Sequence, residues 1–307
     1  MTCVAFDPEG NHAGGAALPA WATALKVHAL REDPYQRVHA SRLVRYLSPI
    51  PLAYAENQVM RDKVESLGDA WDAVVAVQMP VARYLPGGAR AAVIDVDTSL
   101  SFQMAERLHL AGSLPGRVQA WVSYQKARLY EAQHVRRFDL ALVAGAHELP
   151  HTRRIAGLQA RVEVLPNGVD CEHNVPGLTQ AQDGHLVYNG ALTYSANYDA
   201  MRWFLAEVYP RIRQAVPSVS LTITGSTKGI DLTGLALDDT VHLTGFVADV
   251  RLPVAEASVC VVPIRQGGGT RLKILEAMAL GTPVVATTKG SEGLAVTAGE
   301  HLAIADD

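Results

Sequence analysis

The sequence predicts an α/β protein composed of two doubly wound units. Short β-branched and apolar runs alternate along the chain with amphipathic stretches of helical period. A length of 307 residues exceeds what one hydrophobic core usually organises. Between residues 173 and 184 the composition becomes polar and rich in Gly and Pro, as in a linker. We therefore expect a first domain over residues 1–175 and a second domain over residues 176–307.

The overall composition excludes several classes of protein. Hydrophobic residues make up 49% and charged residues 19%, so the chain can bury large cores and is not intrinsically disordered. A formal net charge of -4 provides no general attraction to nucleic acid. Cys3, Cys171 and Cys260 are too few and too scattered for a disulfide framework or a zinc site. No apolar run reaches the roughly 18 residues of a membrane span and no signal peptide is visible, so we expect a cytoplasmic location.

The first half alternates between predicted strands and helices. In chain order we expect a strand at 2–6, a loop at 7–15, a helix at 17–24, an edge strand at 26–30, helices at 35–47 and 59–67, a buried strand at 71–77, a strand at 91–95, a helical region at 101–137 broken at 112–116, and strands at 140–143 and 162–165. In the helix at 35–47, Arg37, Arg42 and Arg45 lie off the apolar positions. This basic face suits an anionic acceptor or a peripheral contact with lipid headgroups, and the alternative is an ordinary solvated surface.

Asp95 and Asp97 lie just past the carboxyl end of a predicted strand, where open parallel sheets bind their ligands. We therefore predict that one of them contacts a substrate. Asp-Val-Asp also has the spacing of two carboxylates that share a divalent metal, but such short acidic patterns are frequent by chance. The structural alternative is capping of the following helix, before Ser99 and Ser101.

The second half repeats the alternation. We expect a strand at 186–188 with a turn at 189–192, a helix at 197–212, strands at 221–224, 241–247 and 259–264, a helix at 270–280 and a strand at 284–286.

A glycine loop precedes the last predicted helix. Gly267, Gly268 and Gly269 follow a β-branched strand and stand directly before Thr270, where the helix is expected to begin. The first N–H groups and the positive dipole end of such a helix attract anions. Because glycines carry no side chain, a ligand can approach this backbone closely. The pattern predicts a phosphate-binding loop, although an ordinary strand-to-helix crossover has the same spacing.

Charged residues occur in the same helix on a face that we expect to be buried with Leu272. Glu276 is about two turns into the helix, and a carboxylate there can accept hydrogen bonds from both hydroxyls of a ribose. Arg271 and Lys273 add positive charge near the loop. The alternative is that Glu276 is simply solvated.

Five segments carry a family resemblance. They read PIRQGGGTRLKILEAMALGTPVVATTKGSEGL, YNGALTYSANYDAMRWF, LTITGS, VHLTGFVADVR and LPNGVD. In these motifs and their order the chain resembles the family 4 retaining glycosyltransferases over roughly its second half. The resemblance implies the GT-B fold, in which two Rossmann-like domains face each other across a cleft. The first half resembles the family only loosely.

The resemblance also implies a function. Members move a sugar from a nucleotide diphosphate donor, here of UDP or GDP type, to an acceptor hydroxyl without a metal or another cofactor. The loops that hold Gly190 and Gly225 then border the donor, backbone groups near Val247 read the base, and Asp95 or Asp97 faces the acceptor or the transferred sugar. Because the leaving phosphate is thought to assist deprotonation of the acceptor, we assign no general base.

The chain departs from the family pattern at several positions. Ala191 and Ala196 stand where many relatives have an Arg and a Lys that hold the diphosphate, so Arg271 and Lys273 are the candidates for that role. Gly268 stands where relatives often have a glutamate that contacts the sugar. Relative to the family, the first strand, glycine loop and helix and the last helix are missing, so we expect an incomplete first domain. Apolar edges left by such truncation favour a homodimer.

Two other functions are compatible with these motifs. One is an epimerase of sugar nucleotides with a GT-B-like fold, which needs no acceptor. The other is a non-catalytic protein that binds nucleotide sugars or acts as a scaffold.

Overall fold

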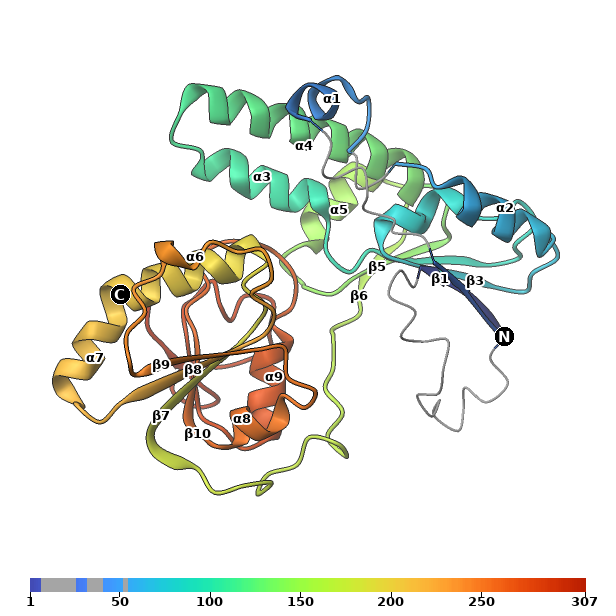
Figure 1. The fold of residues 1–307 in the computed structure, drawn as a ribbon. Helices are drawn as coiled ribbons and strands as arrows, with labels where there is room; N and C mark the ends of the chain where they lie inside the picture. Colours follow the sequence, from blue (N-terminus) through green and yellow to red (C-terminus); the bar gives the residue numbers. More distant parts are fainter. Residues whose placement is uncertain (7–25, 32–40, 52–54) are drawn as a thin grey trace. The chain divides into compact units, whose positions relative to one another are not determined.

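The computed structural model describes residues 1–6, 26–31, 41–51 and 55–307, and these residues form two compact units (Figure 1). The first unit is Met1–Leu165 and the second is Pro166–Asp307. The division therefore falls earlier in the chain than the expected boundary at residue 175. The loop at 7–15 and the helix at 17–24 that the sequence predicts lie outside the described residues, as do residues 35–40 of the helix predicted at 35–47.

The first unit contains two parallel sheets. The order is β1-β2 in one sheet and β3-β4-β5-β6 in the other, and every pairing is parallel. The strands are β1 (Thr2–Phe6), β2 (Lys26–Leu30), β3 (Val74–Val77), β4 (Ala92–Asp95), β5 (Leu140–Val143) and β6 (Val162–Val164). The helices are α1 (Arg42–Leu47), α2 (Gln58–Ser66), the 3-10 helix η4 (Met79–Tyr84), α3 (Leu100–Leu110), α4 (Leu114–Val135) and α5 (Leu149–Ala156).

The prediction of a strand buried on both faces at 71–77 is wrong. Ala76 is buried, but Val75 and Val77 are exposed. The reason is that β3 lies at the edge of its sheet, and successive side chains of a strand point to opposite faces. Only the face that carries Ala76 packs against the core of this unit.

The second unit is built on one six-stranded parallel sheet with the order β12-β11-β10-β7-β8-β9. The strands are β7 (Gln182–Asn189), β8 (Ser220–Thr224), β9 (Val241–Gly245), β10 (Ala257–Val262), β11 (Val284–Ala286) and β12 (Ala303–Ile304). The helices are α6 (Ser195–Trp203), the π-helix η5 (Phe204–Val208), α7 (Tyr209–Ala215), the 3-10 helix η6 (Leu232–Gly234), α8 (Arg251–Ala255) and α9 (Leu272–Ala279). The parallel sheets of both units confirm the predicted α/β class.

The strand order of the second sheet contains a switch point. From β7 the chain builds outward through β8 to β9, then returns to place β10 on the other side of β7 and builds outward again. Helices that follow neighbouring strands at such a point lie on opposite faces of the sheet, which opens a crevice at the carboxyl ends. The loops after β7 and β10 are therefore where the fold favours a ligand.

The helix after the glycine loop differs from the prediction in two ways. It begins at Leu272 and not at Thr270, because Arg271 has a non-helical ψ of 76°. Its buried face is formed by Ile274 and Ala277, whereas Leu272 is exposed. The helical period of the sequence is compatible with burial of either apolar face of this short helix. Packing against β10 and β11 determines which face is buried.

Candidate functional site

The ammonium of Lys273 lies at the switch point. It is 3.4 Å from Oδ1 of Asn197 and 4.0 Å from the ring centroid of Tyr188, the next-to-last residue of β7. A Cβ added to Gly190 would lie only 2.5 Å from Lys273 Nζ, so the missing side chain of this glycine makes room for the cation. Lys273 thus reaches from α9 to the first residue after β7.

Asn197 and Tyr188 fix the surroundings of this cation. The Tyr188 hydroxyl donates to Asn197 Oδ1 at 2.7 Å, and Asn197 Nδ2 donates to the carbonyl of Ala191 at 2.9 Å. Asn197 therefore ties the first turn of α6 to the loop after β7, with its oxygen directed toward Lys273. Sequence reasoning missed Asn197, whose only signal was its place at the start of an expected helix.

Burial changes the proton affinity of the groups at this site. The pKa of Lys273 is lowered to about 7, chiefly by burial and also by Arg271, while Cys260 and Glu276 act in the opposite direction. Burial also raises the pKa of Tyr188 and raises that of the Cys260 thiol to about 12. Tyr188 and Cys260 therefore remain neutral at physiological pH, and Lys273 is the cation whose charge can change there.

Glu276 faces the end of β7. Asn189, the last residue of that strand, donates from Nδ2 to Glu276 Oε2 at 3.1 Å. Glu276 and Lys273 are three residues apart on α9, so both side chains project from one side of the helix. Sequence analysis did not single out Asn189, although it precedes Gly190 in the turn predicted there.

The glycine loop between β10 and α9 is held by Arg271. Gly267 and Gly269 have φ of 96° and 85°, values that residues with a Cβ rarely adopt. The Arg271 guanidinium donates from Nη1 to the carbonyl of Gly268 at 2.6 Å and from Nη2 to that of Gly267 at 2.5 Å. The predicted phosphate partner Arg271 is thus buried and directed at the loop backbone.

The amide groups at this helix start are partly occupied. Leu272 N donates to the carbonyl of Thr270 at 3.1 Å, and Ile274 N donates to that of Arg271 at 2.9 Å. The hydroxyl oxygen of Thr270, by contrast, is buried without a hydrogen-bond partner among the residues that the structure describes. A buried polar atom usually has a partner, so Thr270 is a polar contact that a ligand can complete.

The loops after β7, β8 and β9 touch one another at the carboxyl edge. Gly225 has φ of 109°, and a Cβ there would lie 2.6 Å from Ala191 N. Gly225 N donates to the carbonyl of Gly245, the last residue of β9, at 2.8 Å. Val247, the residue expected near the base, follows at that edge and is partly buried.

Asp95 and Asp97 belong to the other unit. Asp95 is the last residue of β4, and its Oδ1 accepts a hydrogen bond of 3.0 Å from Asp97 N, while Asp97 has φ of 55°. The alternative prediction, that these aspartates cap the following helix, is wrong. Ser99 caps α3, because its Oγ accepts a hydrogen bond of 3.1 Å from Phe102 N. Across the described residues, no cluster of three or more His, Cys, Asp or Glu side chains is arranged to hold a metal ion.

A buried polar cluster follows this aspartate turn. Ser99 Oγ donates to Glu131 Oε2 at 2.9 Å, and Ser99 N donates to Glu148 Oε2 at 2.9 Å. Ser101 Oγ shares a hydrogen bond of 2.8 Å with His151 Nε2. Because α4 and α5 supply these partners, the two helices hold the start of α3 and hence the turn that carries Asp97.

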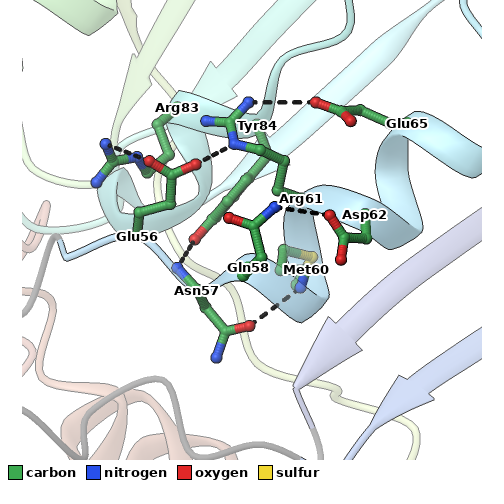
Figure 2. A network of polar contacts seen from close by, with 9 residues as sticks. All are labelled: Glu56, Asn57, Gln58, Met60, Arg61, Asp62, Glu65, Arg83 and Tyr84. Carbon is green, nitrogen blue, oxygen red and sulfur yellow. Dashed lines mark hydrogen bonds and ion pairs between the residues drawn. The ribbon is translucent and has the colours of Figure 1, made fainter.

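A second polar network joins α2 to η4 (Figure 2). Glu56 forms ion pairs with Arg61 and with Arg83, the latter at 3.2 Å. The Tyr84 hydroxyl accepts from Asn57 N at 2.6 Å. These contacts fasten α2 to η4, the segment after β3.

A cavity of about 440 Å³ lies beside this network. Its lining is formed by Arg61, Val64, Glu65, Gly68, Asp69, Tyr84, Leu85, Pro86 and Gly87. The segments at 68–69 and 86–87 precede β3 and β4, so the cavity is near the amino ends of these strands. Parallel sheets bind ligands at the opposite, carboxyl ends, where Asp95 stands. None of the residues predicted for the site lines this cavity.

No helix in the described part of the chain has the length and apolar character that a bilayer crossing requires.

A known protein family matches most of the second unit. Residues 183–307 match the family of glycosyl transferases group 1. An uncharacterized 44.6 kDa protein in the cps region of Klebsiella pneumoniae is 31% identical over 131 residues, which are 40% of this chain and 34% of that protein. The sequence match thus spans about a third of the curated relative, and the family match falls on the second unit.

Solved structures resemble the chain over both units. A structure of Anabaena Alr3699/HepE in complex with UDP-glucose has a TM-score of 0.65 at 15% identity and covers 99% of this chain and 85% of that one. TarM has a TM-score of 0.63 at 14% identity over 84% of this chain and 50% of that one. Sucrose-phosphate synthase from Thermosynechococcus elongatus has a TM-score of 0.57 at 17% identity and covers 81% of this chain and 66% of that one. Residues 183–307 therefore match the family of glycosyl transferases group 1, and the chain has an α/β fold similar to that of GT-B glycosyltransferases.

Proposed function

We propose that the protein is a retaining glycosyltransferase that moves a sugar from a UDP- or GDP-linked donor to an acceptor hydroxyl. One observation carries the proposal. The family match falls on the unit in which Lys273, Glu276 and the glycine loops converge at the switch point. An interior cation beside side-chain-free backbone suits a diphosphate, and a nearby carboxylate suits the two hydroxyls of a ribose.

The proposed donor contacts follow from this geometry. Lys273 binds the diphosphate, with the Thr270 hydroxyl as a second donor to a phosphate oxygen. Arg271 holds the loop in shape and adds positive potential behind it. Glu276 accepts from the ribose, and the backbone near Val247 contacts the base. Asp95 or Asp97 in the first unit contacts the acceptor or the transferred sugar.

In the proposed reaction the bond between the anomeric carbon and the diphosphate oxygen breaks, and the acceptor oxygen bonds to that carbon on the same face. The acceptor proton passes to the leaving diphosphate. Negative charge accumulates on that leaving group, so fixed positive charge at Lys273 stabilises the transition state more than the ground state. No metal or other cofactor is proposed.

The donor is identified by titration calorimetry with UDP, GDP, ADP and the matching nucleotide sugars, followed by assay of nucleotide release with and without sugar and lipid acceptors. UDP-glucose is the first donor to test, because the similar HepE structure contains it. We expect one nucleoside diphosphate to bind and its sugar nucleotide to turn over with an acceptor. Absence of nucleotide binding contradicts the proposal. Epimer formation without acceptor indicates an epimerase, and binding without turnover indicates a binding protein.

Nucleotide binding is expected to take up close to one proton per site at about pH 8. In the free protein Lys273 has a pKa of about 7 because of burial, so it is largely neutral at that pH. A bound diphosphate favours the charged ammonium and raises this pKa, whereas well below pH 7 Lys273 is already charged. Calorimetry in buffers of different ionisation enthalpy measures the uptake. Equal uptake by Lys273→Met would contradict the assignment.

A further inference from the structure

Helix α4 carries apolar residues on two opposite faces, and among the described residues of the first unit only one of these faces is packed. The buried apolar side chains are Ala120, Ala127, Tyr130 and Val135. The exposed ones are Leu114, Val118, Trp121 and Leu129, with exposed fractions of 76%, 49%, 53% and 62%. At 3.6 residues per turn these four fall on a single face opposite the buried one. A helix that is apolar all round usually has a partner on both sides.

Neighbouring elements extend this exposed face. Helices α3 and α4 lie side by side as a hairpin, and Leu110 at the end of α3 is 62% exposed (Figure 1). Helix α1 adjoins α4, because Lys126 Nζ donates to the carbonyl of Tyr46 at 2.6 Å and lies 5.8 Å from its ring centroid. The exposed apolar side chains of α1 are Leu43, Val44, Tyr46 and Leu47. Exposed apolar side chains that gather on neighbouring elements are typical of interaction sites.

The charged residues from the end of α3 to the later part of α4 are all basic. Residues 107–130 contain no Asp or Glu, although the whole chain has a net charge of -4. The basic residues of the stretch are Arg107, Arg117, Lys126 and Arg128. Arg117 and Arg128 share the exposed helical face with Trp121 by their spacing. The first acidic residue past this stretch, Glu131, is buried in the polar cluster and does not reach the surface.

We propose that this face of α4, with the turn between α3 and α4, docks on an anionic lipid bilayer surface. Apolar side chains enter the interfacial region, a tryptophan lies at headgroup level, and arginines contact the anionic headgroups. A second copy of this chain fits less well, because a two-fold contact would bring basic residues against basic residues. The proposal is independent of the donor site in the second unit.

Vesicle sedimentation tests whether the basic residues contribute to binding of anionic lipid. The protein is expected to bind phosphatidylcholine vesicles that contain phosphatidylglycerol, to bind pure phosphatidylcholine vesicles weakly, and to dissociate as salt is raised. The double variant Arg107→Ala/Arg117→Ala is expected to lower the partition coefficient by about 25-fold, which is about fivefold for each arginine. The matched control is Arg154→Ala/Arg211→Ala, which removes two exposed arginines from α5 and α7. Equal loss in both double variants, or none in either, overturns the proposal.

Trp121 provides a second readout that does not depend on affinity. With brominated lipids, its fluorescence is expected to be quenched on vesicle binding. Trp121→Phe is expected to keep binding and to lose most of that quenching, whereas Trp121→Glu loses binding. Leu158→Glu, at a fully exposed position in the same unit, is the control and should bind like the parent. If Trp121→Glu instead changes only the oligomeric state in light scattering, the face is a protein interface and the proposal is wrong.

Discussion

Replacing Lys273 with methionine is expected to weaken binding of the nucleoside diphosphate by at least about 30-fold, because truncating one partner of a desolvated charge pair costs about 2 kcal/mol or more. The side chain keeps its length, so packing against Tyr188 is largely retained while the ammonium is lost. Turnover should fall further than affinity, since charge on the leaving diphosphate grows in the transition state. Calorimetry measures the affinity for the nucleoside diphosphate, and nucleotide-release assays measure the turnover.

The control for this variant is Arg211→Met, which removes a positive charge from an exposed position on α7 in the same unit. It should leave affinity unchanged, because an exposed charge far from the ligand is screened by solvent and salt. Gly190→Ala is a companion that keeps the charge, since its new Cβ would lie 2.5 Å from Lys273 Nζ and displace the ammonium. Affinity of Lys273→Met within threefold of the parent would remove Lys273 from the donor site.

Gly225→Ala is expected to destabilise the second unit by about 3 kcal/mol and to lower its Tm by roughly 6 to 12 °C. Two effects add. The φ of 109° is unfavourable for any residue with a Cβ. The new Cβ would also lie 2.6 Å from Ala191 N and 2.7 Å from the carbonyl carbon of Gly190, and backbone cannot rotate away as a side chain can. Calorimetric unfolding of the whole chain measures the change.

Gly229→Ala separates these two effects. Gly229 also has a positive φ, 75°, but a Cβ there would have nothing within 4 Å. Gly229→Ala should therefore lower the free energy of unfolding only by the cost of the unfavourable backbone conformation, about 1 kcal/mol. If both variants lower Tm equally, close packing of the loops after β7 and β8 does not hold the site together. If Gly225→Ala weakens nucleotide binding at temperatures far below the Tm of the variant, the packed glycines also position the donor loop.

Much of the second unit followed from its sequence. The strand at β10, the glycine loop and the helix after it came from a β-branched run, consecutive glycines and a helical period, which are local signals. Lys273 is interior and Glu276 lies beside β7, whereas Leu272, with which these charges were expected to be buried, is exposed. Local rules sufficed because the crossover from strand to helix is short, so neighbours in sequence are neighbours in space.

Other features depended on contacts between distant segments. Arg271 was predicted to face a phosphate, yet its guanidinium donates to the loop carbonyls of Gly267 and Gly268. Asn189 and Asn197 gave no sequence signal of their partners, which are 87 and 76 residues away in the chain. The exposed apolar face of α4 could not be told from its buried one by sequence, because a helical period does not show how many sides of a helix are covered.

The amino-acid sequence by itself determined the parallel α/β class, the order of strands and helices in each half, and the glycines and charges from which a phosphate site is built. These depend on backbone preference and period, which act over a few residues. Only the tertiary structure decided that β10 pairs with β7, that the Lys273 ammonium lies beside Gly190, and that one apolar face of α4 is exposed. Such outcomes are set by which distant surfaces exclude water from each other, and no local pattern contains that information.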